Sequence, residues 1–208
     1  MSKPNNTTPL GDFRYLLAID CETTGINYTS GNPSDDYQAI SWGILVINAY
    51  NFEIVHEKYI EIQWDGVSKW SKGAEGVHGL SKQHLLENGV TEEEGITQIA
   101  EIVLKYWPLN VSINLLGHNV HLFDKFFLEK LFKKFDMKLN FTQRHVDSFS
   151  VFFTLLHAFN SEDGFTTMGC PPRKLHNALE DIKMTVESLR RIKVIWDSKV
   201  GIHTNNYD

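Results

Sequence analysis

The chain has 208 residues, of which 42% are hydrophobic and 22% charged, and its formal net charge is −6. This length suffices for one sizeable core and leaves little room for a second, so one domain is expected. No stretch approaches the roughly 18 consecutive apolar residues that span a bilayer, and the excess of acid argues against a protein that coats long nucleic acid, because such proteins need Lys and Arg to displace counterions.

The two cysteines, Cys21 and Cys170, are expected to be reduced, and the start of the chain lacks the apolar run of a secretory segment. We therefore expect a cytoplasmic protein with no membrane partner. Residues 1–12 are expected to form a loose polar leader, residues 13–200 one domain, and residues 201–208 a short tail.

Three strands in succession are predicted for the first part of the chain. Residues 14–22 are a short, almost uninterrupted apolar run that ends in acids, which is typical of a strand buried on both faces. Residues 26–37 are rich in Asn, Ser, Gly, Pro and Asp and indicate a loop. Strands over 39–49 and 53–63 follow, so we expect an antiparallel meander.

Helices and strands alternate in the rest of the chain. After short helical pieces, the apolar spacing predicts an amphipathic helix over 90–106, with a capping box of Thr91 and Glu94 at its start and Pro108 at its end. The elements expected next are a strand over 111–117, a helix over 120–135, a strand over 144–147, a helix over 148–159, a Gly/Pro-containing loop over 160–175 and a helix over 178–196. This order predicts an α/β fold with a mixed sheet.

Basic residues are clustered in two places. The first cluster lies in the helix predicted over 120–135 and just after it, and comprises Lys125, Lys130, Lys133, Lys134 and Lys138. The second is the pair Arg173 and Lys174. A solvated helix face and a surface that follows a phosphate backbone are both compatible with the lysine run.

Asp20 and Glu22 lie two residues apart at the carboxyl end of the first predicted strand. Both side chains therefore project from one face, at the edge where α/β sheets usually place ligands. Neighbouring carboxylates repel each other unless a cation separates them, as a metal ion does. The alternative is that the strand ends at Ile19 and both acids are solvated.

Asp124 falls on the apolar stripe of the helix predicted over 120–135, which Asn119 is well placed to cap. A desolvated, isolated carboxylate costs on the order of several kcal/mol, so Asp124 should have a partner. A metal site and a nearby Arg or Lys are the two candidates for that partner.

Asn177 and Glu180 form a capping-box pattern that starts the last helix at Ala178 and leaves His176 one residue outside it. His176 and Asp181 then occupy the two positions that touch in a helix-entry staple, beside the positive end of the helix dipole. The alternative to a joint chemical role is an ion pair that fixes the helix entry.

Four motifs, IDCETTG (19–25), VHGLS (77–81), GHNVHLFD (117–124) and HNALED (176–181), occur in one order along the chain. Together they resemble the DEDD exonuclease superfamily, and the histidine five residues before the last aspartate resembles its DEDDh branch. That branch includes the proofreading (epsilon) subunit of DNA polymerase III, ribonuclease T, oligoribonuclease and phage exonuclease A. The resemblance spans about residues 14–195 and implies a ribonuclease H-like fold, with a mixed five-stranded sheet flanked by helices.

The resemblance also implies a mechanism with two divalent ions, Mg²⁺ or Mn²⁺. Asp20, Glu22 and Asp181 would hold the ion that carries the attacking water, Asp20 and Asp124 would hold the ion at the leaving group, and His176 would be the general base. The implied reaction releases nucleoside 5′-monophosphates from the 3′ end of single-stranded nucleic acid, with DNA favoured and RNA possible.

The substrate-binding residues that the resemblance implies are Thr23, Thr24, His78, Asn119 and Phe123. The Thr23 backbone and Glu22 would contact the terminal 3′ hydroxyl, while His78 and Phe123 would surround the terminal nucleotides, because bases stack on aromatic rings. Core packing is the alternative for Phe123, and fastening of the VHG turn is the alternative for His78.

Two departures from the family pattern concern the second strand and the tail. Relatives commonly carry a glutamate where this chain has Ser41-Trp42-Gly43, and the 26–37 loop is longer than usual. The chain ends about a dozen residues after its last predicted helix, without the tail by which the epsilon subunit grips its polymerase. We expect a free-standing monomer or homodimer, although a polymerase partner is compatible with the motifs.

Two alternative functions are compatible with the motifs, namely an oligoribonuclease or RNA 3′-end trimming enzyme, and a catalytically silent protein that binds nucleic acid. An alternative metal site is a four-ligand zinc site formed by His118, His121, His157 and Cys170, whose spacing matches no zinc-finger pattern.

Overall fold

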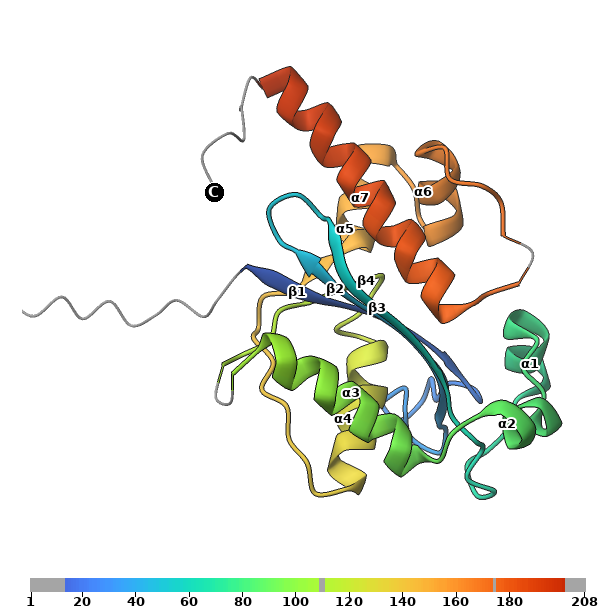
Figure 1. The fold of residues 1–208 in the computed structure, drawn as a ribbon. Helices are drawn as coiled ribbons and strands as arrows, with labels where there is room; N and C mark the ends of the chain where they lie inside the picture. The colour runs from blue at the N-terminus through green and yellow to red at the C-terminus, as the bar shows by residue number, and fades with distance from the viewer. Residues whose placement is uncertain (1–13, 109–110, 174, 201–208) are drawn as a thin grey trace, which may run out of the picture.

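A computed structural model describes residues 14–108, 111–173 and 175–200 of the chain (Figure 1). Its elements in chain order are β1 (Tyr15–Thr23), β2 (Ala39–Asn48), β3 (Ile54–Glu61), α1 (Lys72–His78), α2 (Lys82–Asn88), α3 (Glu92–Tyr106), β4 (Leu115–Gly117), α4 (Asp124–Lys134), β5 (Val146–Asp147), α5 (Ser148–Leu156), α6 (Ser161–Thr167) and α7 (Ala178–Val200). The leader and tail expected at 1–12 and 201–208 lie outside the described residues, as does Lys174.

The five strands form one mixed sheet in the order β3-β2-β1-β4-β5. β1, β2 and β3 pair antiparallel, and β4 and β5 extend the sheet parallel to β1. The predicted α/β class, the opening meander and the ribonuclease H-like five-stranded sheet are therefore confirmed. β1 lies in the centre, so the acids at its carboxyl end stand in the middle of the sheet edge.

Helices cover both faces of the sheet, with α3 and α4 on one side and α5, α6 and α7 on the other (Figure 1). Strand periodicity divides β1 between the two cores, because alternate side chains point to opposite faces. Leu17 and Ile19 join the core under α3 and α4, while Leu16 and Ala18 join the core under α7. Position 20 therefore continues the α7 face of β1.

Local capping signals start two helices where the sequence predicts them. Thr91 Oγ1 accepts a hydrogen bond from the Glu94 backbone at 3.2 Å, and the Glu94 carboxylate accepts one from the Thr91 backbone at 2.9 Å, which completes the predicted capping box of α3. Asn177 Oδ1 accepts hydrogen bonds from the amides of Leu179 and Glu180, both at 3.1 Å, at the start of α7. Both starts are thus decided by neighbouring residues.

Three predicted elements differ most from the structure, while the helix predicted over 148–159 ends three residues earlier, at Leu156. The helix predicted over 120–135 begins only at Asp124, and Asn119 does not cap it, because Asn119 adopts a φ of 57° and its amide donates to Asp147 Oδ1 at 3.0 Å. The strand predicted over 111–117 is limited to β4, with Ile113 bridging Phe141 alone. The loop predicted over 160–175 contains α6, which Asn160 caps.

Three of the five clustered lysines make contacts within the described structure. Lys125 Nζ forms an ion pair with Glu129 at 3.4 Å, one turn further along α4. Lys130 Nζ donates to the Ser34 carbonyl at 2.8 Å and to the Tyr37 carbonyl, so it ties the 26–37 loop to α4. Lys134 forms an ion pair with Glu92 at the start of α3. Both cysteines are free, as predicted, and none of the described helices has the length and apolar character needed to cross a membrane.

Gly43 of β2 allows α7 to approach the sheet closely. It pairs with Asp20 across the β1–β2 ladder, and a Cβ at this position would lie 2.2 Å from the Ala178 carbonyl oxygen and 2.5 Å from the Leu179 nitrogen. Both atoms belong to the backbone of the first turn of α7, which cannot rotate away as a side chain can. The absence of a side chain at Gly43 therefore decides how near α7 comes to Asp20.

We predict that Gly43→Ala lowers the free energy of unfolding by about 1–3 kcal/mol, because overpacking displaces either β2 or the first turn of α7. Urea denaturation measures the change. Gly76→Ala is the matched control, since nothing lies within 4 Å of a Cβ at this position of α1 and Ala favours a helix. Equal stability of Gly43→Ala and wild type would contradict this account of the α7 approach.

Candidate active site

Asp20 and Glu22 lie at the carboxyl end of β1, on the face that α7 covers. Their partners across the ladder are two small residues, Gly43 and Ser41. Strand geometry places both carboxylates on one side, as predicted, because β1 continues to Thr23 instead of ending at Ile19. The alternative of two solvated loop acids is therefore wrong, and Glu22 is only 8% exposed.

Asp124 approaches the same strand end from the first turn of α4. Its Oδ1 accepts a hydrogen bond from the Cys21 backbone amide at 2.9 Å, between the two acids of β1, and its side chain is buried. A backbone amide of β1, and not a lysine or arginine side chain, is the hydrogen-bond donor that holds this carboxylate in place. Asp124 thus joins the acids of β1 through a contact between residues that are 103 positions apart.

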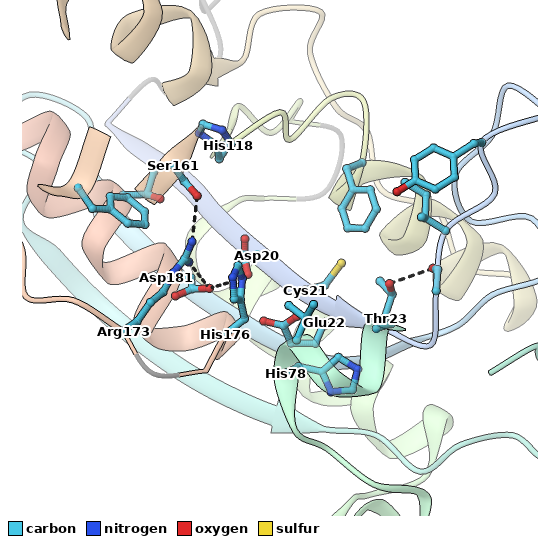
Figure 2. A pocket seen from close by; sticks show the side chains of 18 residues that line it. Asp20, Cys21, Glu22, Thr23, His78, His118, Ser161, Arg173, His176 and Asp181 are labelled. Atoms are coloured by element: carbon cyan, nitrogen blue, oxygen red, sulfur yellow. Dashed lines mark hydrogen bonds and ion pairs between the residues drawn. The ribbon is translucent and has the colours of Figure 1, made fainter. Parts of the chain in front are cut away.

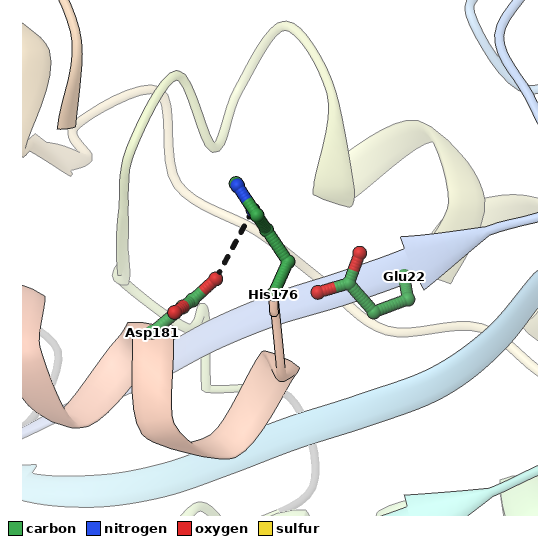
Figure 3. Close-up of side chains that lie close together, drawn as sticks. All are labelled: Glu22, His176 and Asp181. Carbon is green, nitrogen blue, oxygen red and sulfur yellow. Dashed lines mark ion pairs between the residues drawn. The ribbon is translucent and has the colours of Figure 1, made fainter. Parts of the chain in front are cut away.

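His176 and Asp181 meet at the start of α7 as the capping pattern predicts. His176 Nδ1 lies 3.3 Å from Asp181 Oδ2, with the histidine half-exposed and the aspartate buried. The start of α7 carries this pair to the end of β1, where Glu22, His176 and Asp181 bring ligand atoms within 4.8 Å of one another (Figure 3). The histidine–carboxylate pair is therefore part of the acidic cluster.

The VHGLS motif supports His176 from the side of α1. The His176 backbone amide donates to the Val77 carbonyl at 3.2 Å. Gly79 ends α1 with a φ of 74°, and its amide donates to the Glu75 carbonyl at 2.8 Å. Because this left-handed cap turns the chain away directly after the helix, the Val77 carbonyl stays available to hold the segment that carries His176.

Arg173 also bonds to Asp181, which the sequence did not predict. Its Nη1 lies 2.6 Å from Asp181 Oδ2, the same oxygen that faces His176. Two further contacts come from α6. Arg173 Nε donates to Glu162 at 2.8 Å, and Nη2 donates to the Ser161 hydroxyl at 3.1 Å, a contact drawn in Figure 2. The guanidinium therefore sits inside the acidic cluster as the counter-ion of Asp181.

A cavity of about 320 Å³ is lined by Asp20, Glu22 and Asp181 together with His176 and Arg173, whereas Asp124 lies outside its lining (Figure 2). Its described lining comprises Asp20, Cys21, Glu22, Thr23, Gly25, Ile26, Tyr28, Ala74, Val77, His78, His118, Phe123, Ser161, Phe165, Arg173, His176, Asp181 and Thr185. Among the predicted substrate-binding residues, Thr23, His78 and Phe123 belong to this lining. Thr24 is instead engaged with the Gln38 backbone amide at 3.0 Å, and Asn119 with Asp147, so their binding to substrate stays a prediction.

Three carboxyl groups of the cluster, those of Glu22, Asp124 and Asp20, have raised pKa values. Burial and then the negative charge of Asp181 raise the pKa of Glu22 to about 7, although His176 and Arg173 oppose this shift. Burial raises the pKa of Asp124 to about 7, against the hydrogen bonds from Cys21. The pKa of Asp20 is raised well above its ordinary value by burial and by the charges of Asp124, Glu22 and Asp181. The site therefore has too little positive charge for its acids.

A divalent metal ion fits this arrangement. Asp181 Oδ1 is buried without a hydrogen-bond partner in the described structure, and the surrounding donors are mainly carboxylate oxygens, which hard ions such as Mg²⁺ and Mn²⁺ prefer. The alternative zinc group does not assemble: within the described residues, Glu22, His176 and Asp181 are the one cluster with metal-ligand geometry. His118 faces the Ser148 hydroxyl at 3.0 Å and Cys170 faces the Ser188 hydroxyl at 3.4 Å instead.

Sequence reasoning missed the residues that α6 contributes. The sequence marks Arg173 only as part of a basic pair, and it predicts a loop at Ser161 and Phe165. The available signal was Asn160 followed three residues later by Asp163, which form the N-cap contact of α6 at 2.8 Å. Recognising that helix would have placed an aromatic and a hydroxyl residue near the HNALED motif.

The fold is shared with known nucleases. The E. coli exonuclease I–single-stranded DNA complex in its zinc-bound form matches with a TM-score of 0.71 and 15% identity over 87% of this chain, which spans 40% of exonuclease I. The nuclease domain of 3′hExo, a DEDDh family member bound to rAMP, matches with a TM-score of 0.67 and 16% identity, covering 88% of this chain and 92% of that domain.

A third similar structure concerns 3′-end-specific recognition of a histone mRNA stem-loop by a 3′-exonuclease, with a TM-score of 0.64 and 16% identity over 88% of this chain and 64% of the other. No family model matches the sequence, and no curated protein sequence matches it significantly. These likenesses establish that the chain has the DEDD exonuclease, ribonuclease H-like fold, as the motif resemblance implied.

The raised pKa values predict that the metal-free protein loses stability as the pH rises from about 4 to about 7. In that window the folded protein keeps protons on Glu22 and Asp124 that the unfolded chain has already released, so the free energy of unfolding falls with pH. Asp124→Asn should remove part of this slope and raise stability at pH 8 by on the order of 1–3 kcal/mol. Thermal unfolding in EDTA between pH 5 and pH 8 measures both effects.

Glu93→Gln provides the control, because Glu93 is an exposed carboxylate on α3, outside the cavity. It should keep the wild-type slope. A wild-type protein whose melting temperature in EDTA rises between pH 5 and pH 8, with no difference in Asp124→Asn, would show that the acids are not held protonated by the fold.

Proposed function

We propose that this chain is a metal-dependent 3′→5′ exonuclease that hydrolyses the terminal phosphodiester of single-stranded nucleic acid and releases nucleoside 5′-monophosphates. One observation carries the proposal: Asp20 and Glu22 from β1 and Asp181 from α7 line one cavity beside His176. Asp124 from α4 is bonded to the β1 backbone at Cys21, between the two acids of that strand. The fold shared with exonuclease I, solved with single-stranded DNA, and with a 3′-exonuclease supports it.

Asp20, Glu22 and Asp181 would hold one divalent ion, and Asp20 and Asp124 the other. Two Mg²⁺ or Mn²⁺ ions, when bound, would supply an activated water and neutralise the charge on the phosphate. The high pKa values of the metal-free carboxyls agree with this, because a dication favours their ionised forms. Cys21 contributes its backbone amide, which orients the Asp124 carboxylate at 2.9 Å.

His176 is the proposed general base. Its Nδ1 faces the Asp181 carboxylate at 3.3 Å, which favours the tautomer with the proton on Nδ1 and leaves Nε2 as the nitrogen that can accept a proton. The half-exposed ring also lines the cavity. Its backbone is held through Val77, so the imidazole stays near the acids without being part of α7.

Thr23, His78 and Phe123 are proposed to surround the terminal nucleotide. Phe123 lines the cavity and packs on Phe127 with ring centroids 5.1 Å apart, so core contacts hold a ring that also faces the substrate space. His78 is 5% exposed, its Nδ1 accepts a hydrogen bond from the Leu80 amide at 3.0 Å, and burial lowers its pKa. The neutral imidazole of His78 could therefore pack against the sugar of the terminal nucleotide.

DNA is the favoured substrate in this proposal. E. coli exonuclease I has been solved with dA16 and with dT13 oligonucleotides, and the present fold matches both complexes. RNA is the second candidate, because this chain covers 92% of the 3′hExo nuclease domain, which is bound to rAMP. Selection between the two depends on contacts to the 2′ position of the terminal sugar.

The proposal is tested by digesting matched, labelled single-stranded DNA, duplex DNA and RNA oligonucleotides. We expect stepwise shortening from the 3′ end with Mg²⁺ or Mn²⁺, full inhibition by EDTA, and no support from Ca²⁺ alone, because its larger radius and irregular coordination misplace the attacking water. Asp20→Asn should lower the rate by on the order of 10³-fold or more, since it removes a ligand shared by both ions.

The Glu93→Gln variant serves again as the control and should digest at the wild-type rate. Hydrolysis that persists in EDTA, or Asp20→Asn with near-normal turnover in Mg²⁺, would contradict the proposed function. A folded protein that binds oligonucleotides but never shortens them would instead identify the catalytically silent alternative.

The assignment of His176 predicts that His176→Ala lowers the single-turnover rate by on the order of 10²- to 10⁴-fold with little change in substrate affinity. If His176 only fixed the entry of α7, its loss would cost about 1 kcal/mol of stability and leave the rate of the folded protein nearly unchanged. Rates measured at saturating Mn²⁺ across pH separate the two, because protonation of an imidazole base reduces wild-type activity on the acid side. Equal rates of wild type and variant at every pH would contradict the base assignment.

A further inference from the structure

Arg173 is the single lysine or arginine among the described residues that line the cavity. Its side chain is 12% exposed, in a chain whose net charge is −6. The phosphodiester of the proposed substrate is an anion that must enter a cavity already lined by acids. A permanent cation at this position therefore needs an explanation beyond the stability of α7.

The guanidinium is held by α6 independently of Asp181. Nε is bonded to Glu162 and Nη2 to the Ser161 hydroxyl, and the Phe165 ring lies 5.3 Å from the guanidinium carbon. These three contacts fix the plane of the group and leave Nη1 as the arm that reaches Asp181, at 2.6 Å. Loss of the Asp181 contact would thus leave Arg173 in place with one free donor edge.

Asp181 does not depend on Arg173 alone. Its Oδ2 faces both Arg173 and His176, while its Oδ1 is buried without a partner. A divalent ion ligated by Asp181 would take over the neutralisation of this carboxylate, because a dication outweighs a single guanidinium at the same oxygen atoms. The bond to Arg173 is then exchangeable.

We infer that Arg173 is a phosphate-binding residue: its Nη1 edge, which pairs with Asp181 in the structure, would bind a phosphate oxygen of the terminal nucleotide once a divalent ion neutralises Asp181. This inference rests on the proposed nuclease function and names the residue that binds the substrate's charge. Arginine suits this position because its planar donors match phosphate oxygens and because it stays charged when buried.

The contact would act in two ways. It would position the phosphate against the acids, which otherwise repel it, and it would stabilise the negative charge that the phosphate oxygens carry during hydrolysis. Because Glu162 and Ser161 of α6 already hold two nitrogens of the guanidinium, Arg173 would lose little conformational freedom when Nη1 binds a phosphate oxygen. α6 would accordingly serve as the support of the phosphate site.

The test is the affinity of the whole protein for thymidine 5′-monophosphate and for thymidine, measured calorimetrically with Mn²⁺ present. We expect Arg173→Gln to weaken binding of the monophosphate by on the order of 10- to 100-fold, as for loss of a charge-assisted hydrogen bond, and to leave binding of thymidine unchanged. Arg173→Lys should fall between the two, because it keeps the charge and loses the planar donors.

Two controls separate phosphate binding from structural support. Arg191→Gln removes an arginine of α7 that bonds the Met168 carbonyl beyond the end of α6 and lies outside the cavity lining. It should bind the monophosphate like wild type. Titration with Mn²⁺ alone should show that Arg173→Gln still binds metal, and more tightly than wild type, because a competing cation has been removed.

Monophosphate affinity that is the same in wild type and Arg173→Gln overturns the inference, and so does loss of Mn²⁺ binding, which would make Arg173 a support of the metal site. If wild type hydrolyses oligonucleotides in either of these cases, the proposed nuclease function stands without this residue. A wild-type protein that neither hydrolyses oligonucleotides nor binds the monophosphate overturns both.

Discussion

Repulsion among the carboxylates at the carboxyl end of β1 is the constraint on which the rest of the site depends. Asp20, Glu22, Asp124 and Asp181 share a small, largely buried space, and burial together with mutual charge raises the pKa of three of them. Such a cluster opposes folding unless protons or cations neutralise it. The ion pair of Arg173 with Asp181 reduces that repulsion, because it places a positive charge among the acids.

The packing that brings the acids together depends on small side chains in β2. Gly43 and Ser41 stand beside the two acids of β1, and the bare Cα of Gly43 lets the first turn of α7 lie almost on the sheet. A larger residue would keep α7 away and lower the repulsion. The close approach of the acids therefore costs stability when no cation neutralises them, and this is common at sites that bind hard cations.

For the substrate that we propose, the charge of the groups at the cavity matters more than the net charge of the whole chain. The net charge of −6 disfavours long duplexes, whose phosphates must be neutralised over many base pairs. A chain end presents only a few phosphates. In our proposals Arg173, with its edge held by α6, and the two ions supply the positive field that those few phosphates need.

The sequence by itself determined the features that depend on near neighbours. Strand periodicity put Asp20 and Glu22 on one face, and the cap at Asn177 brought His176 to Asp181, because both effects act within a few residues. Tertiary structure alone decided the rest. The late start of α4 follows from the contact of Asn119 with Asp147, 28 residues further along the chain. The bond of Arg173 to Glu162 depends on α6, a helix in the segment that the sequence predicts to be a loop. Neighbouring residues do not predict such contacts, because they form between parts of the chain that meet only when it is folded.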